Sequence, residues 1–317
     1  MQTGLAWIDD NRSALAALAQ RIGEYAEIAF KETRSAAAQA SFLEQQGFAV
    51  HLCAADIPSA LVAAYGSGKP VIGFLGEYDA LIGMSQKASA QREPVQEGAP
   101  GHGCGHNLLG VGSLAAAVGL KSEMEAKGLS GTVRYYGCPA EENGSGKAYM
   151  ARAGLFNDLD VAISWHPGTL NMASYRGSLA VNAVRFAFHG RASHAGGAPH
   201  MGISALDAVE LMNVGVNFLR EHIIQDARIH YVISKGGDQP NVVPAFAEVW
   251  YYVRAPRRQD LNDIYERVIK IAEGAALMTG ARLDIKFEDG CYEYLANPVV
   301  TDVLLESLRA VGGPAFG

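Results

Sequence analysis

Residues 102–107, His-Gly-Cys-Gly-His-Asn, combine two imidazoles, a thiol and two glycines in six residues. This stretch follows a loop rich in Gly and Pro and precedes an apolar run, 108–120, that predicts a helix. Because Cys104 and His106 stand where a turn meets this helix, both can face one metal ion. The glycines let the backbone turn sharply and approach other groups closely. By itself, the stretch fits a metal site and a tight turn with incidental histidines about equally well.

Length and composition limit the class of protein. A chain of 317 residues can form one large domain or two ordinary ones. The 49% of apolar and 19% of charged residues are typical of a soluble protein with a large core, and the net charge of −7 argues against a general nucleic-acid-binding surface. The four Cys residues form no C-x-x-C pair, which favours a reducing compartment and a cytoplasmic location. The N-terminus lacks the pattern of a signal peptide. The sequence also has no apolar run of about 18 residues that would predict a membrane span.

The first half of the chain mixes helical and strand patterns. Apolar residues at helical spacing predict helices over 5–22, 27–46 and 107–127. Short apolar runs bounded by Gly and Pro predict strands. These predicted strands are residues 48–52, 60–65, 71–75, 131–138 and 160–165. The mixture predicts an α/β domain.

Ligand-type side chains follow three of these strands. Asp79 comes after the strand 71–75, the pair Glu141-Glu142 after 131–138, and His166 after 160–165. In open α/β sheets, ligands bind beyond the carboxyl ends of strands, so these residues are expected to meet the Cys/His stretch at one edge of the sheet.

Two acidic motifs leave alternatives open. Neighbouring side chains diverge, so one carboxylate of Glu141 and Glu142 can bind an ion while the other holds a water beside it. The commoner fate of a Glu-Glu pair is an exposed acidic loop. Glu77, two residues before Asp79, is expected only to cap a loop.

The pattern changes at about residue 178. The predicted order is strand, helix, strand, strand, helix, strand, which is the split βαβ plan of ferredoxin-like domains. The elements are residues 178–189, 203–222, 228–234, 247–254, 261–278 and 282–288. We therefore predict an α/β domain over 1–177 and a smaller ferredoxin-like domain over 178–292, followed by a new segment over 293–317 with a helix near 301–310.

Six motifs in this order resemble the aminoacylase and glutamate-carboxypeptidase family of metallopeptidases, and within it the amidohydrolase branch. They are Gly-Glu-Tyr-Asp-Ala-Leu (76–81), His-Gly-Cys-Gly-His-Asn (102–107), Cys-Pro-Ala-Glu-Glu (138–142), Trp-His-Pro (165–167), Ala-Ser-His-Ala (192–195) and Gln-Pro-Asn-Val-Val-Pro (239–244). The likeness covers nearly the whole chain. It implies a catalytic α/β domain with a mixed sheet and two divalent ions (Zn, Mn or Ni). It also implies an inserted ferredoxin-like lid that forms a homodimer, and a return to the catalytic domain that begins in 293–317.

The resemblance implies a metal site at matching positions. The implied ligands are Cys104, His106, Glu142 and His166. Cys104 would bridge the two ions. Asp79 would orient the metal-binding His106, as partners of metal ligands commonly do.

The resemblance also implies the groups that act on the substrate. Glu141 would be the general base, and His194 of the lid would reach the active site of the partner subunit. Asn241 and Arg254 would hold the substrate carboxylate, which a guanidinium can grip through two hydrogen bonds.

The implied reaction is hydrolysis of an amide bond to an amino acid with a free carboxylate, in an aminobenzoyl-glutamate-like or N-acyl-amino-acid substrate. A dipeptide is the alternative substrate. In the family, the catalytic domain continues beyond the lid and supplies a last His ligand, so a catalytically incomplete metal-binding or dimerisation protein is a further alternative for a chain that stops at Gly317. A homologous second subunit is a conceivable partner. A nucleotide-binding domain is not supported, because the chain has no G-x-G-x-x-G or P-loop at a strand–helix turn.

Overall fold

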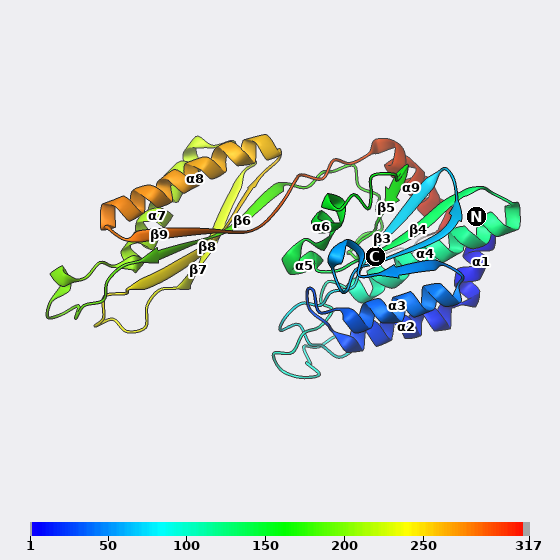
Figure 1. Ribbon diagram of the computed structural model, residues 1–317, viewed down its shortest axis with the longest axis horizontal. Coiled ribbons are helices and arrows are strands. Elements are labelled where there is room, and N and C mark those ends of the chain that lie inside the picture. The colour runs from blue at the N-terminus through cyan, green and yellow to red at the C-terminus, as the bar shows by residue number, and fades with distance from the viewer. Residues whose placement is uncertain (1, 313–317) are drawn as a thin grey trace. The chain divides into compact units, whose positions relative to one another are not determined.

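The computed structural model describes residues 2–312, so the last five residues of the predicted segment 293–317 lie outside the described residues. The chain forms two compact units, the first ending at Leu170 and the second beginning at Asn171 (Figure 1). The predicted domain limits after 177 and 292 remain predictions.

The first unit contains a five-stranded mixed sheet with the strand order β1-β2-β4-β3-β5. Strand β3 runs parallel to its neighbours β4 and β5, whereas β2 runs antiparallel to β1 and β4. The strands are β1 (Ala49–Leu52), β2 (Leu61–Ser67), β3 (Val71–Glu77), β4 (Gly131–Cys138) and β5 (Val161–Ile163). All five predicted strands are present. The carboxyl ends of β3, β4 and β5 therefore meet at one edge of the sheet.

Helices pack on both faces of this sheet. The side chains of Tyr135 and Tyr136 on β4 point to opposite faces. Tyr135 belongs to the apolar core that α2, α3 and α4 cover, and Tyr136 belongs to a smaller core that includes Met150 of α6. The helices are α1 (Gln2–Asp10), α2 (Arg12–Tyr25), α3 (Thr33–Gln45), α4 (His106–Lys127), α5 (Glu141–Gly144) and α6 (Gly146–Arg152), with a short 3₁₀ helix, η1 (Ala54–Asp56).

The first two predicted helices differ from the observed ones. The predicted helix 5–22 divides at Asn11 into α1 and α2. The predicted helix 27–46 begins only at Thr33, because α2 ends at Ala26 in a left-handed conformation (φ 44°) and the chain then turns. The Glu27 carboxylate accepts hydrogen bonds from the first N–H groups of α3, those of Arg34 and Ser35, at 3.1 and 2.9 Å. Glu27 thus satisfies the start of α3 from outside the helix.

The second unit is built on a four-stranded antiparallel sheet with the order β7-β8-β6-β9. This order confirms the predicted ferredoxin-like plan. The elements are β6 (Ala180–His189), η2 (Pro199–Met201), α7 (Ala205–Leu219), η3 (Arg220–His222), β7 (Arg228–Lys235), β8 (Phe246–Ala255), α8 (Arg258–Thr279), β9 (Arg282–Cys291) and α9 (Pro298–Val311). A core that includes Phe186, Met212, Tyr251 and Val268 lies between the sheet and the helices α7 and α8.

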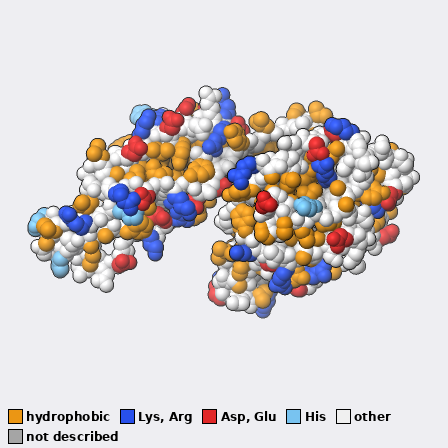
Figure 2. All heavy atoms as spheres, in the orientation of Figure 1, with side chains coloured by type: hydrophobic (Ala, Val, Ile, Leu, Met, Phe, Trp, Pro, Cys, Tyr) orange, Lys and Arg blue, Asp and Glu red, His pale blue; other side chains and the backbone are white. Residues whose placement is uncertain are grey.

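Acidic and basic side chains are interspersed on the face drawn in Figure 2, so this face carries no large patch of one charge. Within residues 2–312, none of the helices is both long and apolar enough to cross a membrane.

Candidate metal centre

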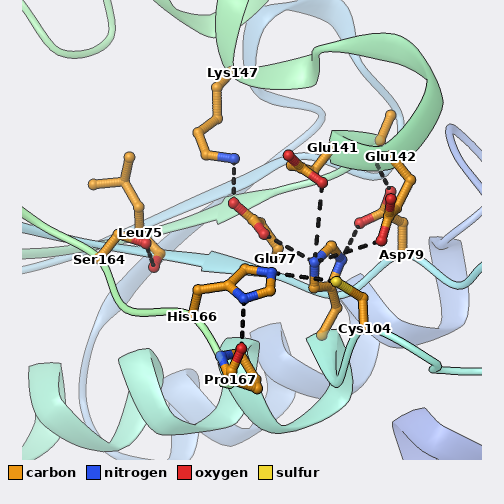
Figure 3. A network of polar contacts seen from close by, with 12 residues as sticks. Leu75, Glu77, Asp79, Cys104, Glu141, Glu142, Lys147, Ser164, His166 and Pro167 are labelled. Atoms are coloured by element: carbon orange, nitrogen blue, oxygen red, sulfur yellow. Dashed lines mark hydrogen bonds and ion pairs between the residues drawn. The ribbon is translucent and has the colours of Figure 1, made fainter. Parts of the chain in front are cut away.

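Ligand-type side chains gather at the carboxyl ends of β3, β4 and β5. Figure 3 shows the side chains of Glu77, Asp79, Cys104, Glu141, Glu142 and His166 pointing toward one another. The ligand atoms of Cys104, His106 and His166 all lie within 4.8 Å of one another, and so do those of Glu77, His106 and Glu141. The structure therefore brings together all the site residues that were predicted in the first unit.

His106 opens α4 and lies buried at the centre of this cluster. Its Nδ1 donates a hydrogen bond to Asp79 Oδ1 (2.8 Å), and the other Asp79 oxygen accepts one from the Glu142 backbone N–H (2.9 Å). Burial raises the pKa of Asp79, but these two hydrogen bonds outweigh burial, so the pKa lies below its ordinary value. With Nδ1 engaged, Nε2 is the His106 nitrogen that faces the cluster.

Two glycines let α4 begin at this place. Gly105 precedes the helix with a φ of +74°, which a side chain would strain. Gly110 lies so close to the end of β3 that a Cβ there would come within 2.7 Å of the Glu77 carbonyl oxygen. The close approach of α4 to β3 brings His106 to the strand end.

Cys104 and His166 form a second contact in the cluster. The His166 Nδ1 donates to the Pro167 carbonyl (2.8 Å), and its Nε2 lies 3.3 Å from the Cys104 sulfur. Burial and the carboxylates of Glu142, Glu141 and Glu77 raise the pKa of Cys104 to about 11. The thiol therefore carries its proton at neutral pH in the metal-free protein and must release it to bind a metal.

The residues present fit a divalent metal ion. Three buried ligand-type atoms, Glu77 Oε2, His106 Nε2 and Glu142 Oε1, lack a hydrogen-bond partner among the described residues. A buried polar atom without a partner costs about 1–3 kcal/mol, which a bound cation would offset. Thiolate, imidazole and carboxylate are also the donor types that zinc and its neighbours prefer.

Glu141 and Glu142 differ in their surroundings. The Glu142 side chain is 18% exposed and the Glu141 side chain 43%, and their nearest oxygens lie 3.9 and 4.0 Å from His106 Nε2. Burial and the nearby Glu77 carboxylate raise the pKa of Glu141. The more open carboxylate is thus the one that a water and a substrate could reach.

A buried carboxylate that the sequence did not single out holds the Glu-Glu pair in place. Ala140, which precedes the pair, has a left-handed conformation (φ 57°), and its N–H donates to Glu32 (2.8 Å). The other Glu32 oxygen accepts from the Ser59 hydroxyl (2.7 Å). No local pattern reveals this contact, because Glu32 and Ala140 are 108 residues apart in the chain.

The expectation that Glu77 caps a loop was wrong. Glu77 ends β3 with only 7% of its surface exposed. One of its oxygens lies 3.1 Å from His106 Nε2, and the other accepts a hydrogen bond from the Lys147 ammonium group. A usable signal existed in the sequence, since Glu77 stands just beyond the predicted strand 71–75, at the strand end where ligands of an α/β sheet bind. Lys147 has no comparable signal in the sequence around it.

The remaining predicted site residues lie in the second unit, where His194 and Asn241 are neighbours. His194 forms an isolated bridge with Val242, and the Ala195 N–H donates to the Asn241 carbonyl (2.9 Å). The exposed His194 ring accepts backbone hydrogen bonds at Nδ1 from Gly196 and Gly197 (3.1 and 2.9 Å). Its proton therefore sits on Nε2, which is free to donate.

Arg254 lies at the other end of the same strand pair. In the register of β6 with β8, Phe246 pairs with His189 and Arg254 with Val181. Eight residues along a strand span about 26 Å, so Arg254 lies about that far along β8 from Phe246, the strand end that the Asn241 loop precedes. The Arg254 Nε is buried and has no hydrogen-bond partner within residues 2–312.

Comparisons with known proteins identify the family. Residues 173–278 match the model of a peptidase dimerisation domain. The chain is 48% identical to one of the subunits of the p-aminobenzoyl-glutamate hydrolase of Escherichia coli, over 100% of this chain and 67% of that protein. It is 31% identical to the Xaa-Arg dipeptidase of Mus musculus, over 96% of this chain and 70% of that protein. A solved dinuclear metal-binding peptidase of the M20 family from Bacillus subtilis shares the fold, with a TM-score of 0.67 and 18% identity over 96% of this chain and 81% of that one.

The chain thus belongs to the M20 family of peptidases and amidohydrolases, which confirms the predicted family and fold class. It is a hydrolase of amide bonds in a family that includes dinuclear metal-binding peptidases. The residues that match the dimerisation domain, 173–278, lie within the second unit.

Proposed function

We propose that this protein hydrolyses the amide bond of p-aminobenzoyl-glutamate or a closely similar N-acyl amino acid. The observation that carries the proposal is the cluster of Cys104, His106 and His166 beside Glu141 at the sheet edge, in a chain 48% identical to a subunit of the E. coli p-aminobenzoyl-glutamate hydrolase. Cys104, His106, Glu142 and His166 would hold two divalent ions, Zn, Mn or Ni, with Cys104 between them.

In this proposal, the chain's own residues divide the chemistry. Bound divalent ions supply Lewis-acid polarisation of the amide carbonyl and a more acidic water. Glu141 takes the proton from the attacking water and passes it to the leaving amine. Asp79 fixes the tautomer and the orientation of His106 through the 2.8 Å hydrogen bond. His194 donates from Nε2 to the developing oxyanion.

The site is proposed to be shared by two chains of a homodimer. Arg254 and Asn241 would hold the substrate carboxylate from different chains, and His194 would reach the active site of its partner subunit. The span of about 26 Å between the two ends of the β6–β8 pair supports this division. The second unit also offers a surface for pairing, namely the edge strand β7 and the exposed apolar residues Leu211, Val214 and Phe218 on one side of α7.

The cellular setting belongs to the same proposal. The four cysteines of the sequence form no C-x-x-C pair, which supports a reducing compartment and hence a cytoplasmic enzyme. The name of the E. coli relative describes one subunit of its enzyme, which supports a homologous second subunit as a further partner.

A dipeptidase is the second candidate, and the 31% identity to an Xaa-Arg dipeptidase favours it. The test offers purified protein, loaded with Mn²⁺, Zn²⁺ or Ni²⁺, three substrates: p-aminobenzoyl-glutamate, an N-acetyl amino acid and an Xaa-Arg dipeptide. We expect chelator-sensitive release of glutamate to be the fastest reaction. Faster cleavage of the dipeptide would favour the second candidate. Metal binding without cleavage of any substrate would replace both with a metal-binding role.

A further inference from the structure

The buried Glu77 and the half-buried Lys147 form an ion pair beside the candidate metal centre, and neither residue belongs to the predicted ligand set. Glu77 stands at the end of β3, and Lys147 comes from α6 (Figure 3). The Glu77 side chain is 9% exposed and that of Lys147 is 31% exposed. Lys147 occupies only one Glu77 oxygen, Oε1, which leaves Oε2 directed toward His106.

The geometry between Glu77 and His106 is not that of a hydrogen bond. Glu77 Oε2 and His106 Nε2 lie 3.1 Å apart, yet neither atom has a hydrogen-bond partner among residues 2–312. The two atoms are close but are not aimed at each other. Two ligands of one ion, each about 2.1 Å from it at a right or tetrahedral angle, lie about 3.0–3.4 Å apart. The observed spacing is that of neighbouring ligands.

The Lys147 contact gives this carboxylate a defined binding mode. An ammonium group on Oε1 restrains the side chain and discourages an ion from using both oxygens. Groups that hydrogen-bond to a ligating carboxylate orient it in this way, and their loss commonly lowers metal affinity by roughly 10–100-fold. Lys147 would thus orient the Glu77 carboxylate as Asp79 orients the His106 ring.

We propose that Glu77 is a further metal ligand, binding through Oε2 and held in place by Lys147. The inference rests on the metal-dependent function proposed above. The competing role for Glu77 is to neutralise His106 in the metal-free protein and to be displaced by the ion. The two roles predict opposite changes in metal affinity when the carboxylate charge is removed.

Glu77→Gln tests the proposal by calorimetric titration of metal-free protein with Zn²⁺ and by the absorption spectrum of the Co²⁺-loaded protein. We expect the affinity of one ion to fall roughly ten-fold or more and the Co²⁺ bands to shift. Glu44→Gln, an exposed glutamate on α3, is the matched control and should leave both unchanged. Unchanged or tighter binding by Glu77→Gln would overturn the proposal in favour of the competing role.

Three further variants keep the test decisive. If Glu77→Gln fails to fold, Glu77→Asp retains the charge but withdraws the carboxylate by one methylene, and it should also weaken binding. Lys147→Met should lower affinity less than Glu77→Gln does, and equal affinity to wild type would remove Lys147 from the proposal. Cys104→Ala in the same titration distinguishes failure of the Glu77 inference from failure of the proposed function. Loss of binding there with no change in Glu77→Gln would refute only the Glu77 inference, whereas wild-type protein that binds no metal would refute the proposed function itself.

Discussion

The two units treat their polar groups in opposite ways. The first unit buries ligand-type side chains at the carboxyl ends of parallel strands, where Asp79 and His106 are almost fully enclosed. The second unit fills its interior with apolar residues and leaves His194 and Asn241 exposed on adjoining loops. In the function proposed above, the first unit fixes the metal-binding groups within one chain, and the second unit presents the exposed groups that would meet the substrate in a partner chain.

The largest effect is expected from Glu141 of the first unit, the proposed general base. Glu141→Gln preserves size and removes the proton acceptor, so turnover should fall by roughly 10²–10⁴-fold while metal content stays unchanged. Steady-state kinetics together with metal analysis of the same sample checks this. Near-normal turnover with metal retained would show that the first unit's chemistry lies elsewhere.

Loss of the Cys104 thiol should have the next largest effect. Cys104→Ala removes a donor 3.3 Å from His166 Nε2, so metal affinity should fall by more than the roughly 10–100-fold that loss of an outer partner costs. Equilibrium dialysis with metal analysis measures it. Cys53→Ala, which changes an exposed cysteine remote in sequence from the cluster, is the matched control. Unchanged stoichiometry and affinity would make Cys104 structural.

The strand ends of the first unit show how much of this arrangement the sequence could predict. Residues 71–75, 131–138 and 160–165 had strand character, and the ligand-type residues after them converge because β4, β3 and β5 are parallel neighbours. The strand order of the second unit also followed from its alternating elements. These elements could be predicted because the spacing of apolar residues that marks a strand or a helix involves only residues near one another in the sequence.

Contacts between distant residues could not be predicted in the same way. Glu32 reaches Ala140, and Lys147 reaches Glu77 across 70 residues of chain. Each contact depends on how α6 and the loop before α3 pack, which no local spacing encodes. The late start of α3 has the same cause, since Glu27 acts through its side chain rather than as a helical residue.

The proposed contribution of the second unit to substrate binding can be measured by substituting Arg254. Arg254→Ala should raise KM about ten-fold or more for substrates with a free carboxylate, since a charge-assisted hydrogen bond contributes about 1.5–3 kcal/mol. Kinetics with a carboxylate substrate and with its amide-capped analogue checks this. The capped analogue should respond little. An equal loss for both would assign Arg254 to packing.

The first unit should also show a defined pH dependence of metal binding. The pKa of Cys104 in the metal-free protein is raised to about 11, so the thiol is protonated at neutral pH and binding must expel that proton. Apparent affinity should therefore rise with pH, by about ten-fold per unit for each proton released. Competition with a chelator at several pH values measures the slope. Cys104→Ala should lower it by one proton, and an unchanged slope would exclude the thiol as a ligand.

The proposal that two chains share each active site is tested most directly by mixing two inactive variants, Glu141→Gln and His194→Ala. If the first unit of one chain works with the second unit of its partner, each mixed dimer has one site with both groups intact and one site lacking both. After subunit exchange, activity should then return to about half of the wild-type level per mixed dimer, as site counting for a two-fold dimer requires. No recovery, with exchange demonstrated independently, would contradict the shared site and return His194 to its own chain.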